Sequence, residues 1–138
     1  MIMANTNLET LLTHIDIHTG SREQVMKQIV VAYSNQCDIS KLEPETVGDQ
    51  LLRLSQSAAL MHNNNLDKSQ RYLRWNVPKQ IEPFQLALFL SMNTDSIVDV
   101  MNNEVDFMRL IWSYAIGYSK QDIGKVKSEI LKLQERGE

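Results

Sequence analysis

Apolar residues recur at intervals of three and four along most of this chain, and this spacing constrains the fold more than any other feature. In the clearest stretch the separations are four, three, four and three, at Val47, Leu51, Leu54, Ala58 and Met61. Side chains at these intervals share one face of an α-helix, whereas a half-buried strand alternates with a period of two. The stretch is short for a coiled coil, so we expect a core-facing helix, with a dimer seam as the alternative.

Few residues interrupt this pattern, because the 138 residues include only 5 glycines and 3 prolines. Helix start and stop signals fall between the apolar stretches. Ser21 with Gln24 forms a capping-box pattern, Pro44 suits a first helical turn, and Ser119 can cap a last helix. We therefore predict an all-α protein, a compact helical bundle of about seven or eight helices.

One segment breaks the pattern most clearly, the sequence HNNN at residues 62–65. Consecutive asparagines favour turns because their side chains compete for local backbone hydrogen bonds. We place an internal boundary here, which separates an N-terminal helical part (1–65), expected to form a dimer contact, from a C-terminal helical part (66–138). The alternative is one continuous domain.

Charge is distributed unevenly. The net charge is −3, which argues against a protein whose whole surface binds nucleic acid. Residues 68–79 contain four bases and no acid, whereas residues 80–108 contain no lysine or arginine. The second segment has five acids: Glu82, Asp95, Asp99, Glu104 and Asp106. The sequence thus predicts two regions of opposite charge.

Motifs for catalysis, metal binding and membrane insertion are weak. A single cysteine, Cys37, excludes an intramolecular disulfide and favours a reducing, cytoplasmic location. His14 and His18 lie four residues apart but close to Gly20, where the first helix should end, so we do not expect a metal site. We therefore expect no enzyme, no cofactor and no membrane segment.

Residues 83–102 fit the pattern of a helix-turn-helix. With Pro83 as the first motif position, apolar residues stand where the motif buries them: Leu86, Ala87, Leu90, Met92, Ile97 and Val100. Asn93 can cap the second helix. Together with Ser91, Ser96 and Asn102, these residues make the region resemble the lambda-repressor and Cro type of DNA-binding domain, over about residues 67–118.

The resemblance implies a small transcriptional regulator that binds double-stranded DNA, as a dimer. The residues expected to contact DNA are Arg71, Arg74, Lys79, Asn93, Thr94, Ser96 and Lys120. The sequence departs from the family's pattern in three respects. Ser91 replaces the family's turn glycine, Pro83 replaces its first-position glutamine, and the recognition helix carries Asp95 and Asp99 but no cation.

An acidic, cation-free helix also suits a protein partner with a basic surface. The alternative function is therefore a non-enzymatic inhibitor or adaptor, of the kind found in phages and mobile elements. Its contact surface would be the five acids between Glu82 and Asp106.

Aromatic and basic residues mix in the segment before the motif. Tyr72 and Trp75 stand among Lys68, Arg71 and Arg74, a combination also found in single-stranded nucleic-acid sites. Because the two aromatic residues lie three apart on one predicted helix, which Asp67 would cap and Val77–Pro78 would close, we expect both in the core.

Overall fold

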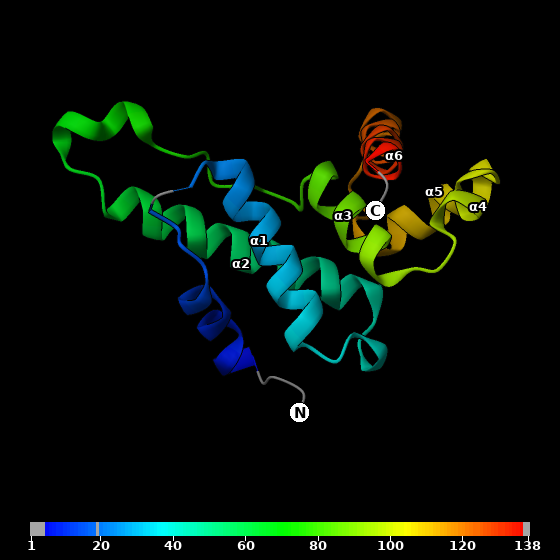
Figure 1. Ribbon diagram of the computed structural model, residues 1–138, viewed down its shortest axis with the longest axis horizontal. Coiled ribbons are helices and arrows are strands. Elements are labelled where there is room, and N and C mark those ends of the chain that lie inside the picture. Colours follow the sequence, from blue (N-terminus) through cyan, green and yellow to red (C-terminus); the bar gives the residue numbers. More distant parts are fainter. Residues whose placement is uncertain (1–4, 19, 137–138) are drawn as a thin grey trace.

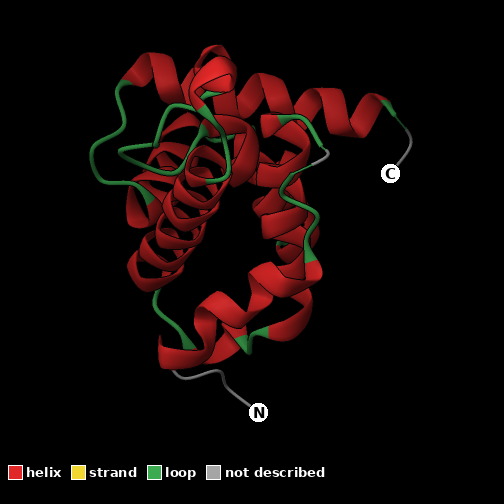
Figure 2. Cartoon of the chain, turned by 90° about the vertical axis from the view of Figure 1, so that its left-hand side faces the viewer, coloured by secondary structure: helices red, strands yellow, loops and turns green. Residues whose placement is uncertain are grey.

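A computed structural model of the chain describes residues 5–18 and 20–136 and confirms the all-α fold. Figure 2 shows helices joined by loops, with no strand in this part of the chain. In chain order, with α for α-helices and η for 3-10 helices, the elements are η1 (Asn5–His14), α1 (Arg22–Gln36), η2 (Ile39–Lys41), α2 (Pro44–Asn64), η3 (Lys68–Leu73), α3 (Pro83–Asn93), α4 (Ile97–Met101), α5 (Glu104–Tyr114) and α6 (Lys120–Glu135).

Local capping signals fix most helix starts. Ser21 and Gln24 form the expected capping box, because the Ser21 Oγ accepts from the Gln24 amide at 3.2 Å and the Gln24 Oε1 accepts from the Ser21 amide at 3.0 Å. Pro44 is the first residue of α2, and Ser119 caps α6. The starts of α1 and α6 follow from short-range hydrogen bonds, whereas the start of α2 has no capping side chain and follows from the fixed φ of proline.

The segment after the asparagines differs from the prediction. Asp67 caps a helix as expected, but that helix is the six-residue 3-10 helix η3, which ends at Leu73 rather than continuing through Trp75. The prediction that Tyr72 lies in the core was wrong, because its side chain is 82 % exposed. Without a buried face, nothing in the core extends η3 into a longer helix.

The hydrophobic core crosses the boundary expected near residue 65. One cluster of buried residues extends from η1 to α6, and α3 packs most extensively against α6 and then against α1. The buried amide of Gln85 reinforces this arrangement: its Nε2 donates to the Ser55 Oγ of α2 at 2.9 Å and to the Met26 carbonyl of α1 at 3.3 Å. Helix α3 is therefore the central element of the fold.

Helices α2 and α5 approach closely at Gly48. A Cβ atom at this position would lie 2.2 Å from the Tyr114 carbonyl oxygen, inside any van der Waals contact. Glycine is required here because the α5 backbone occupies the space of a side chain. This contact holds α5 against the N-terminal part of the chain.

The two ends of the molecule are formed by different segments. The end of α2, η3 and the extended segment after it project at one end of the long axis, and α4 with the start of α5 lies at the other (Figure 1). We call residues 60–79 the arm.

In the part of the chain that the structure describes, no helix has the length and hydropathy to cross a membrane.

Candidate functional site

Five of the twelve predicted contact residues lie in or beside the turn between α3 and α4: Asn93, Thr94, Asp95, Ser96 and Asp99. Helix α3 continues through Ser91 to Asn93, and the chain turns over residues 94–96. The left-handed residue is Ser96, with φ 56° and ψ 43°, and it is the N-cap residue of α4. Ser91, which stands where the repressor family has its turn glycine, therefore lies within a helix, and the left-handed residue comes five positions later.

Burial in the helix pair follows the motif in part. Leu86, Ala87 and Leu90 of α3 and Ile97 of α4 are buried, as the motif requires. Met92 is 41 % exposed, because α3 runs past the expected turn and carries this side chain to the surface. The second helix, α4, is only five residues long. The resemblance to the repressor family stays a prediction.

A hollow of about 450 Å³ opens at this turn, and we call it the turn hollow. Its lining includes Thr94 and Ser96 from the predicted DNA-contacting residues, and Asp95 and Asp99 from the predicted protein-contacting residues. The remaining lining residues are Ser91, Ile97, Val98 and Gln134. The structure thus gathers three hydroxyls and two carboxylates around one hollow whose lining has no cation.

The chemistry of the turn hollow favours a cationic ligand. Asp95 and Asp99 are both exposed, and neither takes part in the ion pairs of the described residues. The Ser91 Oγ is buried at the edge of the hollow without a hydrogen-bond partner. Carboxylates and hydroxyls together accept the several N–H donors of an ammonium or guanidinium group.

The other predicted acids divide into two groups. Glu104 and Asp106 are exposed in the first turn of α5, next to α4, where they also complement the helix dipole. Glu82 lies at the opposite end of α3 and is paired with Arg22, whose Nη1 donates to Glu82 Oε1 at 3.1 Å. Glu82 therefore belongs to the junction between α1 and α3 and not to the acidic surface.

The predicted cations are not brought together. Lys120 lies beside α4, where it lines a crevice of about 140 Å³ with Met101 and Glu104. Arg71 is in η3 and Arg74 follows it, so both lie in the arm at the other end of the molecule (Figure 1). These two arginines are too far from α4 to flank it.

Asn93 has a structural role that the sequence did not reveal. It does not cap α4, because it is the last residue of α3 and Ser96 takes the cap position. Its Nδ2 donates to the Ser34 Oγ of α1 at 3.0 Å and to the Phe89 carbonyl at 2.9 Å. The side chain thereby fastens the end of α3 to α1.

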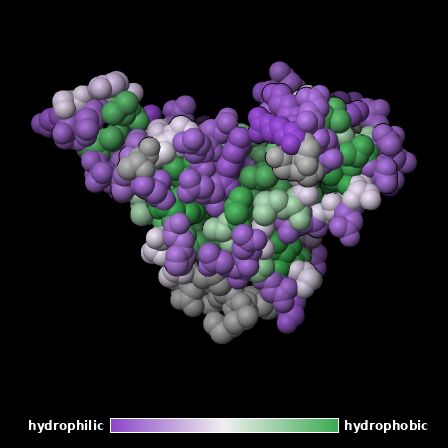
Figure 3. Space-filling view, viewed as in Figure 1, coloured by the Kyte–Doolittle hydropathy of each residue, from purple (hydrophilic) through white to green (hydrophobic). Residues whose placement is uncertain are grey.

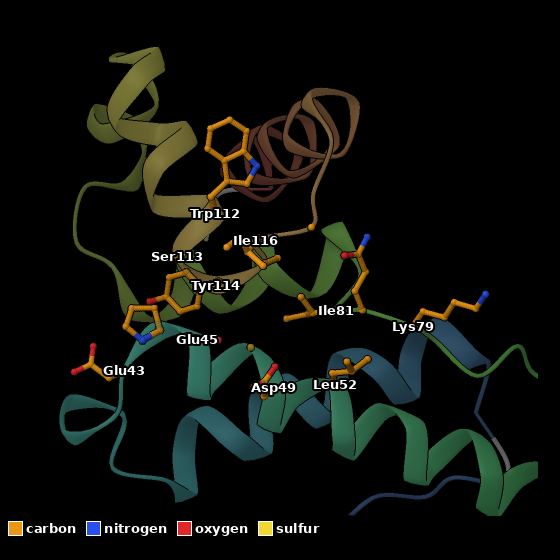
Figure 4. Close-up of a pocket in the computed structure, with 15 residues that line it drawn as sticks. Glu43, Glu45, Asp49, Leu52, Lys79, Ile81, Trp112, Ser113, Tyr114 and Ile116 are labelled. Carbon is orange, nitrogen blue, oxygen red and sulfur yellow. The ribbon is translucent and has the colours of Figure 1, made fainter.

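A separate groove of about 520 Å³ contains the last of the predicted cations, Lys79. Figure 4 shows Glu43, Asp49 and Leu52 on its α2 side and Ile116 on the opposite side. The lining contains no histidine or cysteine. Sequence reasoning missed this groove because its walls come from three separate segments. The one sequence signal for it is the group of acids Glu43, Glu45 and Asp49.

No protein family, curated protein or solved structure matches the chain.

Reactive and metal-binding residues do not gather in the described part of the chain. It contains no group of three or more histidine, cysteine, aspartate or glutamate residues placed to hold a metal ion. Burial raises the pKa of the Cys37 thiol, which disfavours the reactive thiolate. The turn hollow is therefore the best candidate site among the residues that the sequence selected.

Proposed function

We propose that this chain is a non-enzymatic protein-binding module that offers its acidic α4 end to a basic partner surface. One observation carries the proposal: Asp95 and Asp99 are exposed on a hollow whose lining has no cation. A lysine or arginine of the partner would insert into the turn hollow, where its N–H groups would donate to the two carboxylates. Glu104 and Asp106 nearby would add to the attraction.

The distribution of charge supports this orientation of the partner. No lysine or arginine occurs between residues 80 and 108, and the cations of the arm lie at the far end of the molecule. The cations near the α4 end come from the neighbouring helices: Arg109 is exposed on α5, and Lys120 and Lys127 of α6 line the crevice beside Met101 and Glu104. An acidic surface steers a basic partner toward it, with an association rate that falls as salt screens the charges.

The test compares three proteins as bait in affinity capture from an extract of the source cells, with quantification of every captured protein. These are the wild type, Asp95→Asn with Asp99→Asn, and a matched control with Glu43→Gln and Glu45→Gln. All removed charges are exposed, so each variant should fold. We expect a basic partner that the wild type and the control retain and that the α4 variant loses by at least tenfold. Equal capture by all three, or no partner at all, would refute the proposal.

A second proposal, the dimeric DNA-binding regulator, is favoured by a different observation. Leu86, Ala87 and Ile97 are buried as a helix-turn-helix requires, and Lys120 stands beside the second helix. The test is fluorescence anisotropy with labelled genomic duplexes at low ionic strength. We expect salt-sensitive binding that Lys120→Gln weakens, and sedimentation as a dimer through residues 1–65. Absence of salt-sensitive duplex binding would exclude this function.

A further inference from the structure

The arm exposes an aromatic residue between two arginines. Tyr72 is 82 % exposed, the highest exposure of any large hydrophobic side chain except Ile116 among the described residues. Arg71 and Arg74 flank it, and both are also exposed. A tyrosine in this position contributes nothing to the core and presents a free ring face to a ligand.

Hydrogen bonds hold the arm in one conformation. The Asn63 side chain pairs with both backbone groups of Trp75: its Nδ2 donates to the Trp75 carbonyl at 2.9 Å, and its Oδ1 accepts from the Trp75 amide at 2.8 Å. The His62 ring bonds to the Leu73 carbonyl through Nε2 at 3.0 Å and stacks on Trp75 with ring centres 3.7 Å apart. Gln56 donates to the Pro78 carbonyl at 3.0 Å. The extended segment is thus fastened along α2.

The same region carries uncompensated positive charge. Lys68, Arg71 and Arg74 take part in none of the ion pairs of the described residues. No acid occurs from residue 68 to residue 81, and the nearby Asp67 carboxylate accepts from the amide and hydroxyl of Ser69. The arm is therefore a fixed surface that presents one exposed ring with three of its cations, Lys68, Arg71 and Arg74, in the same short segment.

We propose that the arm binds single-stranded nucleic acid. Lys68, Arg71 and Arg74 would contact the phosphates, and an unpaired base would stack on Tyr72. Exposed amides at Asn64, Asn65 and Asn76 stand nearby as donors and acceptors for base edges. Because the arm is held in place before binding, little conformational entropy is lost in the complex.

A duplex and a membrane fit this surface less well. In a duplex the bases are stacked on one another, so the Tyr72 ring has no partner. Figure 3 shows hydrophobic residues exposed on the arm, but the aliphatic ones are partly covered, with exposures of 38–50 % at Leu60, Met61, Leu73 and Val77. A six-residue helix with so small an apolar face is too short to embed in a lipid interface.

Fluorescence anisotropy with the full chain tests the proposal. The probes are fluorescein-labelled, mixed-sequence RNA and DNA single strands of about 20 nucleotides, with the matching duplexes for comparison. For three phosphate contacts, log Kd should rise with log salt with a slope of about 2, or about 16-fold between 50 and 200 mM salt. The single strands should bind at least about tenfold more tightly than the duplexes.

Variants assign the binding to the arm. Tyr72→Ala should weaken single-strand binding at least about fivefold, whereas Tyr72→Phe, which keeps a ring, should restore it. Arg71→Gln with Arg74→Gln should lower both the affinity and the salt slope. The matched control, Lys125→Gln with Lys127→Gln, removes two exposed cations of α6 and should change little.

Several results would overturn the proposal. These are no single-strand binding at 50 mM salt, duplex binding of equal strength, and equal losses in the α6 control. Capture by vesicles of phosphatidylserine and phosphatidylcholine, or self-association of the chain, that depends on Tyr72 in place of single-strand binding would assign the arm to another ligand. Asp95→Asn with Asp99→Asn should leave single-strand binding intact, so the arm and the turn hollow can fail independently.

Discussion

The two ends of this molecule are both built on a short helix, but different forces hold them. Helix α4 is anchored by apolar burial, because Ile97 and Met101 are buried and the helix packs against α5 and α6. Helix η3 has no buried residue, and the arm is instead fastened by the polar side chains of His62, Asn63 and Gln56. The ends also carry opposite charge.

This difference determines how each end should respond to change. Apolar burial is non-directional and tolerates small displacements, so α4 should lose stability in proportion to the surface it loses. Hydrogen bonds are directional, and a buried amide without its partner carries a desolvation penalty. The arm should therefore detach as a unit when one key side chain is removed, while the core stays folded.

The largest expected effect is a loss of stability at high pH, caused by tyrosines in the core that both ends share. Burial raises the pKa of Tyr33 and of Tyr118 above the ordinary value of about 10. The folded state then retains protons that the unfolded state releases, so stability is intact below pH 10 and falls above it. The loss should reach about 1.4 kcal/mol for each tyrosine and each pH unit.

Urea titrations between pH 8 and pH 12, followed by circular dichroism, would measure this loss. Tyr118→Phe should flatten the slope above pH 10. If hydrogen exchange showed one end released well before the other in this range, the shared core would not control both ends.

The next largest effect tests whether apolar burial holds α4, in contrast to the hydrogen bonds that hold the arm. Ile97→Ala should lower the free energy of unfolding by about 3 kcal/mol, because it removes a fully buried branched side chain beneath α4. Val105→Ala is the matched control, since Val105 is 56 % exposed and its loss should change stability by less than about 0.5 kcal/mol. Chemical denaturation measures both. Equal effects of the two variants would mean that α4 is not anchored by burial.

Loss of the Asn63 side chain, which makes two hydrogen bonds to the arm, should lower global stability less than Ile97→Ala does. Its effect on the local stability of the arm should be larger. Asn63→Ala deletes two hydrogen bonds to Trp75 and should lower stability by about 1–3 kcal/mol, with residues 66–78 losing protection against hydrogen exchange. Asn64→Ala, an exposed neighbour, serves as the control. If the arm stayed protected in the Asn63 variant, its conformation would depend on other contacts.

The smallest effects locate the turn between α3 and α4. Ser96→Gly should raise stability by about 0.5 kcal/mol, because glycine adopts the left-handed conformation without strain but is more flexible when unfolded. Ser91→Gly should lower it by about 1 kcal/mol, because Ser91 lies within a helix. Thermal melts of both variants measure these two changes in stability. The opposite pair of signs would place the turn where the repressor pattern predicts it.

Sequence reasoning succeeded where a structure depends on neighbours in the chain. The capping box at Ser21, the helix start at Pro44 and the apolar face of α2 from Val47 to Ala58 were predicted, because each involves residues within a few helical turns. Met61, predicted on the same face, is 44 % exposed. Sequence reasoning failed for Tyr72, whose three-residue spacing from Trp75 suggested a core face. Spacing shows that two side chains share a face, but not whether anything covers that face.

The candidate site follows the same division. The sequence alone determined that the chain is helical, that residues 80–108 lack cations, and that residues 68–79 are basic, since these depend on composition and periodicity. Only the tertiary structure decided that Glu82 is neutralised by Arg22, 60 residues away, and that the two arginines of the arm lie at the far end from α4. Long-range packing sets such distances, and no local pattern records which helices will meet.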